Sequence, residues 1–138
     1  EKGLKTVIVT SGTATMESLE KVLPVTDAFN IDLKSFSDEF YKWAGGDLET
    51  VKAFIQRAAR DAHVELTTLV IPGKNDGEDE MEEMAGWIAS ISPDIPLHIT
   101  RYFPQYQSHI PMTPKETLEK LKAIAEKHLN HVYLGNIR

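Results

Sequence analysis

The chain has 138 residues, of which 41% are hydrophobic and 26% are charged, and its formal net charge is −6. This length suits one domain with a sizeable core, and the negative charge argues against nucleic acids and anionic membranes as partners. No apolar run approaches the ~20 residues of a membrane span, and no signal-like segment opens the sequence, so we expect a cytoplasmic protein. The absence of cysteine excludes disulfides, zinc–thiolate sites and any iron–sulfur cluster held by the chain's own thiolates.

Strand-like and helix-like patterns alternate through the first half of the chain. Residues 4–10 are rich in β-branched side chains and end at Ser11-Gly12, which predicts a strand that runs into a turn. A short helix is expected over 15–23, because Pro24 stops it. The other features expected in this half are a strand over 28–34, an insertion over 37–46 and a helix capped by Asp47.

The alternation continues in the second half. Acidic residues between 78 and 83 suit the positive end of a helix dipole, so they predict a solvated helix start. The segment Thr113-Pro114-Lys115-Glu116 has the pattern of a capping box with proline at the first helical position, which predicts another helix start. Strands are expected over 64–71, 96–103 and 132–134.

This order gives about five strands and four helices, and such alternation implies parallel strands with right-handed crossovers. An open doubly wound sheet and part of a (β/α) TIM-type barrel both fit. A sheet covered on both faces should have almost entirely apolar strands, but these strands carry a polar row, which favours the barrel. The row comprises Asn30, Asp32, Lys34, Glu65, Thr67, His98, Thr100 and Tyr102. Since a full barrel needs roughly 250 residues, we expect an α/β partial barrel in which residues 1–138 form a single domain with its helices outside.

The strand over 28–34 has two distinct faces. Phe29 and Ile31 point one way and can pack under helices, whereas Asp32 and Lys34 point the other way, about 6.6 Å apart along the strand at ~3.3 Å per residue. Opposite charges at the end of an apolar strand are costly to desolvate unless they satisfy each other or bind something. The pair is therefore either a buried ion pair inside a barrel or a ligand site at the carboxyl end of the strand, where α/β proteins place their chemistry.

Three segments in this order resemble the later strands of radical S-adenosylmethionine (SAM) enzymes. The nearest group resembles the pyruvate formate-lyase activating enzymes and their relatives, including the radical enzyme encoded beside Memo-type proteins. The segments are Asn30-Ile31-Asp32-Leu33-Lys34-Ser35, Thr68-Leu69-Val70-Ile71-Pro72-Gly73 with Asn75-Asp76 after it, and Pro96-Leu97-His98-Ile99-Thr100-Arg101-Tyr102-Phe103-Pro104.

The resemblance implies a set of cofactor-binding residues. Asp32 and Lys34 approach the methionine part of SAM, where an ammonium can pair with the carboxylate and an aspartate with the amino group or a bound cation. The turn after the first strand, usually Thr-Asn-Gly in the family, is here Thr10-Ser11-Gly12, so the resemblance assigns Thr10 and Ser11 to the cofactor. It also assigns Leu69, Val70 and Ile71 to the adenine, and His98, or the Tyr102-Phe103 pair, to the ribose and substrate side.

The chain departs from the family in one respect. The family's Cys-x-x-x-Cys-x-x-Cys motif and its glycine-rich cofactor-amine motif are both missing, and Glu1 to Gly3 resemble the tail of a preceding helix. We therefore expect the C-terminal half of a radical SAM barrel that lacks the N-terminal cluster-binding units. The full-length protein is then expected to bind SAM and a [4Fe–4S] cluster, and to generate a 5′-deoxyadenosyl radical that abstracts hydrogen from a glycine of a partner glycyl-radical enzyme or from another substrate. The isolated chain is expected to be inactive and to bind neither cofactor tightly.

Two other functions remain open. Lys34 could act as a Schiff-base nucleophile of a barrel lyase, or the half-barrel could be a non-catalytic interaction module.

Unpaired strand edges, notably that of residues 4–10, predict a homodimer. Trp43 and Trp87 are interpreted as packing or interface residues, and His128 with His131 as histidines suited to a helix C-terminus and not as metal ligands.

Overall fold

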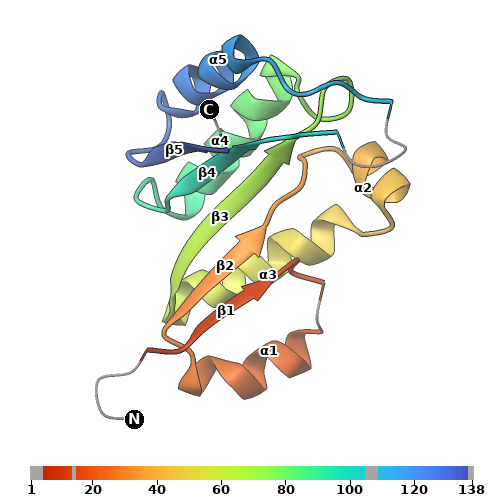
Figure 1. Ribbon diagram of the computed structural model, residues 1–138. Helices are drawn as coiled ribbons and strands as arrows, with labels where there is room; N and C mark the ends of the chain where they lie inside the picture. Colours follow the sequence, from red (N-terminus) through yellow and green to blue (C-terminus); the bar gives the residue numbers. More distant parts are fainter. Residues whose placement is uncertain (1–4, 14, 105–108, 137–138) are drawn as a thin grey trace.

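The computed structural model describes residues 5–13, 15–104 and 109–136, which form one sheet of five parallel strands in the order β1-β2-β3-β4-β5. The order in the sheet is therefore the order along the chain (Figure 1), as the alternating pattern predicts. The elements are β1 (Val7–Thr10), α1 (Met16–Val22), the 3₁₀ turn η1 (Leu23–Val25), β2 (Ala28–Asp32), α2 (Asp38–Ala44), α3 (Leu48–Asp61), β3 (His63–Val70), α4 (Glu78–Ile91), β4 (Leu97–Arg101), α5 (Lys115–Ala125) and β5 (Val132–Gly135).

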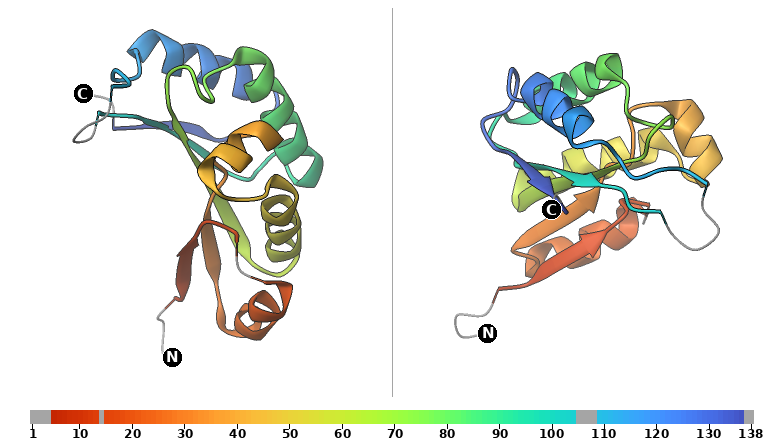
Figure 2. Two further views of the ribbon diagram at one scale, coloured as in Figure 1. Left: turned by 90° about the vertical axis from the view of Figure 1, so that its right-hand side faces the viewer. Right: turned by 45° about the horizontal axis from the view of Figure 1, so that its top comes forward.

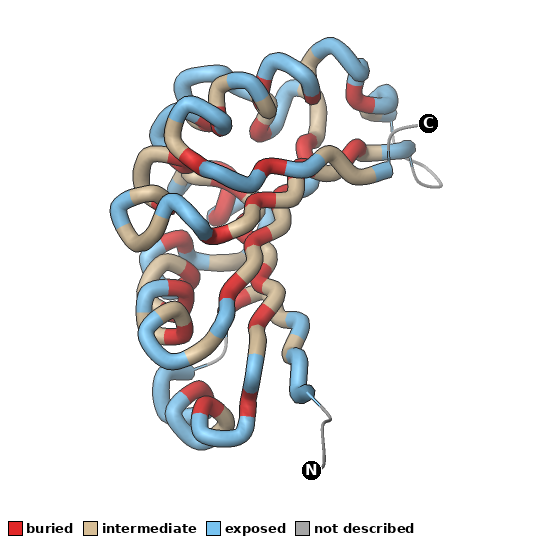
Figure 3. Tube along the Cα trace, turned by 90° about the vertical axis from the view of Figure 1, so that its left-hand side faces the viewer, coloured by how far each residue is buried: buried red, intermediate tan, exposed pale blue. Residues whose placement is uncertain are grey.

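The helices of the described residues all cover one face of the sheet and leave its other face without a helix. Figure 2 shows the sheet as a strongly curved layer with the helices on its convex side. Buried positions in β2 and β3 alternate with half-exposed ones, so each strand has one side against the helices and one side on the concave face (Figure 3). The partial barrel predicted from the polar row is confirmed, since that row follows the concave face. Within the described residues, no helix is long and apolar enough to cross a membrane.

The core lies between the convex face of the sheet and the helices. Phe29 and Ile31 of β2 are 1% and 0% exposed, and the ring of Phe29 meets that of Phe54 on α3 edge to face, with centroids 5.9 Å apart. Leu66 lies opposite Ile31 in the register between β2 and β3, and it is also fully buried. The period of two in the strands thus matches the apolar stripes of the helices, and burial of these faces drives the fold.

The segment over 37–46, expected as an insertion, contains the helix α2, so the described residues hold five α-helices and not four. Ser37 caps the helix by accepting a hydrogen bond from the backbone N–H of Phe40. Gly45 ends it with φ of 87° in the left-handed region that glycine adopts freely. The N-terminal signal, Ser37, and the C-terminal signal, Gly45, are both present in the sequence. Of the two, only the Gly45-Gly46 pair is used in the prediction, as the end of the segment.

The capping box predicted at Thr113 does not form. The helix α5 begins at Lys115, after Pro114, and the Thr113 side chain does not cap it. The Thr113 hydroxyl instead donates to the Val70 carbonyl at 2.6 Å and accepts from the Tyr102 N–H at 3.0 Å. Because both main-chain groups lie at buried strand ends, leaving them without a partner would cost more than an uncapped helix.

The one-sided cover predicts opposite outcomes for two apolar residues on neighbouring strands. Truncating Phe29 to alanine should lower the free energy of unfolding by about 3–5 kcal/mol, because the side chain leaves a cavity under α3. Truncating Val9, which is 76% exposed on the concave side, should change it by less than about 0.5 kcal/mol. Urea unfolding of Phe29→Ala and Val9→Ala measures both, and a large loss in Val9→Ala would contradict a bare concave face.

Candidate functional site at the carboxyl ends of β2 and β3

Asp32 and Lys34 lie side by side on the concave face at the carboxyl end of β2. The Lys34 Nζ is 3.7 Å from the Asp32 Oδ2, and the two side chains are 42% and 47% exposed. The pair is therefore open to solvent and accessible to a ligand. The alternative of a buried ion pair inside the barrel is excluded for this structure.

The main chain of Lys34 is held firmly, although its side chain is open. Its N–H donates to the Tyr41 hydroxyl at 2.9 Å, and its carbonyl accepts from the Asn75 Nδ2 at 2.6 Å and from the Thr68 Oγ1 at 3.3 Å. Tyr41 comes from α2 and Thr68 from β3, so two elements besides β2 position this one residue. The base of the lysine is thus fixed, and only the flexible part of the side chain is free to adjust to a ligand.

Asn75 joins the ends of the two strands. Besides Lys34, its Nδ2 donates to the Leu69 carbonyl at 2.8 Å, and its Oδ1 accepts from the Ile71 N–H at 2.7 Å. The residue is only 7% exposed, and the amide bridges β2 to the turn after β3. The sequence places Asn75 in a turn, where its type is common, but nothing local indicates that it reaches across to β2.

Glu80, in the first turn of α4, anchors the loop that follows Lys34. Its carboxylate accepts hydrogen bonds from the Ser35 hydroxyl and, at 2.9 Å, from the Phe36 N–H. The prediction of a solvated helix start is therefore wrong for Glu80. An acidic side chain at this helix N-terminus still interacts favourably with the helix dipole. The Glu80 carboxylate in addition accepts the hydrogen bond of the buried Ser35 hydroxyl.

A cleft of about 360 Å³ opens beside Lys34, between α2 and the end of β3. It brings together three of the predicted site residues, Lys34, Leu69 and Ile71. Trp43 is 58% exposed and lines the same cleft, so it is not packed into the core, whereas Trp87 packs against the Phe36 ring as predicted. The other lining residues are Phe40 and Ala44.

The main chain after β3 is used internally. The Leu69 carbonyl and the Ile71 N–H both bond to Asn75, and the Val70 carbonyl accepts from Thr113. The Val70 side chain is 1% exposed and faces the helices. This segment therefore offers a ligand the apolar side chains of Leu69 and Ile71, and not polar main-chain groups.

Thr10 and Ser11 do not line this cleft. Thr10 lies opposite the buried Ile31 in the register, so it faces the helices, and its hydroxyl accepts from the Gly12 N–H at 3.1 Å. The Ser11 hydroxyl is 2.9 Å from that of Thr13. Gly12 itself has φ of 74°, and a Cβ there would stand 3.2 Å from a methyl of Val51, so the turn requires glycine.

His98 belongs to a second cluster lower on the concave face. Glu65 bridges two imidazoles, with its Oε2 3.0 Å from the His63 Nε2 and its Oε1 2.7 Å from the His98 Nε2. Hydrogen bonds from His63 and then His98 lower the pKa of the Glu65 carboxyl. The ring of Tyr133 stacks on His98 with centroids 5.3 Å apart. His98 is thus placed apart from the Lys34 cleft, and its pairing with Glu65 was missed because the partners are 33 residues apart in sequence.

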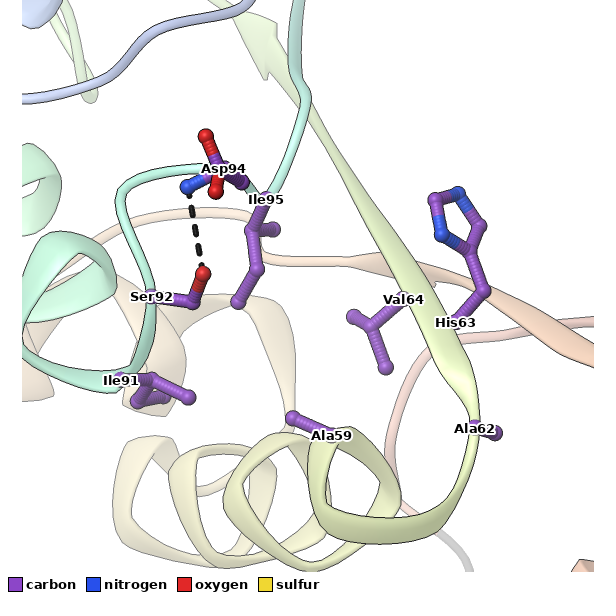
Figure 4. A pocket seen from close by; sticks show the side chains of 8 residues that line it. All are labelled: Ala59, Ala62, His63, Val64, Ile91, Ser92, Asp94 and Ile95. Carbon is purple, nitrogen blue, oxygen red and sulfur yellow. Dashed lines mark hydrogen bonds between the residues drawn. The ribbon is translucent and has the colours of Figure 1, made fainter.

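Another pocket, of about 220 Å³, lies at the amino end of β3 (Figure 4). Its wall includes Val64, Ala59 in α3 and Ala62 just after it, and Ile91 and Ser92 at the end of α4. Ligand sites in α/β folds lie at the opposite, carboxyl end of the strands. In the ranges that the structure describes, no group of three His, Asp or Glu residues could hold a metal ion. The Lys34 cleft is therefore the candidate site.

No protein-family model matches the sequence, and no curated protein matches it significantly. Solved structures do match. A domain of pyruvate-formate lyase-activating enzyme from Bacteroides vulgatus superposes with a TM-score of 0.83 at 20% sequence identity, over 98% of this chain and 83% of that one. A radical SAM methyltransferase from Sphaerobacter thermophilus superposes with a TM-score of 0.77 at 14% identity, over 93% of this chain and 39% of that one.

The chain has the fold that these two solved structures share. The likeness confirms the predicted architecture, a curved sheet of five parallel strands with its helices on one side. At these identities it concerns the fold, and the roles of single residues rest on the geometry above.

The burial of the Tyr41 hydroxyl predicts a loss of stability in alkali. Burial raises the pKa of Tyr41 from its ordinary value of 10.0 to about 12, although the hydrogen bond from the Lys34 N–H acts in the opposite direction. Because the folded protein holds the Tyr41 proton more tightly than the unfolded chain, the stability linked to this proton is complete below pH 10 and is lost as the pH rises towards about 12.

The variant Tyr41→Phe should be less stable at neutral pH by about 1–3 kcal/mol, because the Lys34 N–H loses its partner. It should also lose stability less steeply than the wild type above pH 10. Urea unfolding at a series of pH values measures both effects. Parallel pH profiles for the two proteins would show that Tyr41 does not titrate as the buried position requires.

Proposed function

We propose that this chain forms the SAM-binding wall of a radical SAM enzyme. The observation that carries the proposal is the arrangement of Lys34 and Asp32, half exposed and 3.7 Å apart on the concave face, beside an apolar cleft. SAM has a carboxylate, an amino group and a flat aromatic base, and we assign to these groups Lys34, Asp32 and the apolar walls of the cleft. The fold shared with a pyruvate-formate lyase-activating enzyme domain supports the same assignment.

In this proposal each side chain has one task. The Lys34 ammonium pairs with the carboxylate of the methionine part, and Asp32 accepts from its amino group, because charge-assisted hydrogen bonds are the strong ones. Leu69 and Ile71 give apolar contact to the adenine. We assign His98, which is hydrogen-bonded to Glu65 and lies outside the Lys34 cleft, to the ribose or substrate side of the cofactor.

The residues of this chain fit SAM but do not fit the [4Fe–4S] cluster, since the chain has no cysteine. The cluster would have to be held by other residues of a complete enzyme, of which this chain is the C-terminal portion. Bound SAM and a cluster together would supply the radical chemistry that removes a hydrogen atom from a substrate, and we propose a glycine of a partner enzyme as that substrate. This chain contributes binding and orientation only, so we expect it to be inactive alone.

The Schiff-base alternative is not favoured by the geometry. A lysine nucleophile is activated by desolvation in an apolar pocket or by a second cation. Lys34 has instead a carboxylate neighbour and a side chain that is 42% exposed.

Titration of the ¹⁵N-labelled chain with SAM tests the proposal. Amide resonances near Asp32, Lys34 and Leu69 should shift, with weak affinity of the order of 1 mM, because the chain supplies only part of the cofactor's contacts. The variant Lys34→Met should weaken binding by roughly ten- to a hundredfold, since one charge-assisted contact is worth ~1.5–3 kcal/mol.

Lys21→Met is the matched control, because Lys21 is exposed in the last turn of α1 and loses the same charge far from the cleft. Thermal unfolding shows whether each variant remains folded. Shifts confined to other surfaces, or equal affinity in wild type and Lys34→Met, would refute the proposed role of the concave face.

We also propose that the chain self-associates through the outer edge of β1. In the described part of the chain, β1 pairs with β2 alone, and its side chains Val7 and Val9 are 59% and 76% exposed. An exposed apolar edge strand offers unpaired N–H and C=O groups to another chain. A lysine at such an edge blocks pairing, so Val9→Lys should remain monomeric where the wild type forms dimers. Light scattering over a concentration series measures this, and a wild type that stays monomeric throughout would contradict it.

A further inference from the structure

Trp43 is an exposed aromatic residue that is nevertheless held in place. Its ring is 5.4 Å from that of Phe40, nearly edge to face, and the Lys74 ammonium lies 4.5 Å from its centroid. Phe40 is buried and belongs to the same helix, α2, while Lys74 comes from the turn after β3. A surface tryptophan fixed by an aromatic and a cationic neighbour loses little conformational freedom when a ligand binds.

Trp43 lines two adjoining clefts. It lines one cleft with Lys74 and the other with Lys34, and Phe40 also lines both. The cleft on the Lys34 side is about 360 Å³, within the range of roughly 300–1,000 Å³ typical of small-molecule sites. Leu69 also lines it, so a flat ring that enters would meet an aromatic side chain and a branched aliphatic one.

The polar groups around this cleft favour recognition of a ring by its faces and of one charge by a lysine. The main-chain groups of Leu69 and Ile71 are occupied by Asn75, so the edges of a ring find no partner there. The Lys34 Nζ is 3.7 Å from Asp32, longer than a hydrogen bond, and within the described residues it has no other ion pair. Its N–H groups therefore remain available to an anion.

We propose that this cleft binds a planar aromatic carboxylate, with the ring against Trp43 and the carboxylate on Lys34. The apolar walls, the Lys34 ammonium and the fixed indole together select this class of ligand. The inference goes beyond SAM binding and does not depend on it, because a small aromatic carboxylate has neither the sulfonium nor the nucleoside.

Two carboxylates of similar size test the stacking without any variant. Benzoate should shift the indole N–H resonance of Trp43 and the methyl resonances of Leu69 in the labelled chain, and cyclohexanecarboxylate, which has the charge but no aromatic face, should bind roughly fivefold more weakly. Equal affinity for the two compounds, or no shift at Trp43, would overturn the proposal. A failed titration with SAM would leave it standing, so the two hypotheses fail separately.

Variants then assign the two contacts. Trp43→Leu keeps apolar bulk but should abolish the preference for benzoate. Trp87→Phe removes the other indole and should keep that preference. The two variants also show which indole N–H resonance belongs to which tryptophan. Lys34→Met should weaken both carboxylates by about tenfold, and Lys21→Met should weaken neither. Trp43→Leu with unchanged preference for benzoate would contradict the stacking role.

Discussion

The amide of Asn75 meets a constraint that the sheet alone leaves unsolved. Near the carboxyl ends of β2 and β3, main-chain groups need hydrogen-bond partners, because buried polar groups without hydrogen bonds are costly. One buried side chain supplies them, donating to the carbonyls of Lys34 and Leu69 and accepting from Ile71. This link fixes the main chain of Lys34, Leu69 and Ile71, which line the cleft, and Tyr41 adds a second hold on Lys34.

A bare concave face distinguishes this fold from a doubly wound sheet. Every helix in the part of the chain that the structure describes packs on the convex side, so the polar positions of the strands remain available to ligands. The charges there are partly paired, as Lys34 with Asp32 and His98 with Glu65, which limits the cost of keeping them on a half-covered surface. The cleft lies at the carboxyl ends of β2 and β3. The charged pair of Lys34 and Asp32 therefore lies next to the apolar surface of Leu69 and Ile71.

The sequence alone predicts the order of the strands and their two faces, because the period of two in segments such as Phe29 to Lys34 is local information. It also predicts that Lys34 and Asp32 share the concave side. It fails where a side chain bonds to a distant main-chain group, as Thr113, Glu80 and Asn75 do. In each case the local rule for a cap, a helix dipole or a turn competes with a long-range partner that no short motif reveals. The exposure of Trp43 was not predicted either, since it depends on how α2 sits against β3.

The strictly sequential strand order has a consequence for how the molecule is assembled. Each strand pairs with its immediate predecessor and successor in the chain, so no strand must wait for a distant segment before it can dock. A growing polypeptide could add one strand and helix at a time as the ribosome releases them, keeping loop closures short at every step. The same strand order means that a terminal strand and its helix can be lost without breaking the pairing of the remaining strands, because the loss only exposes a new edge strand.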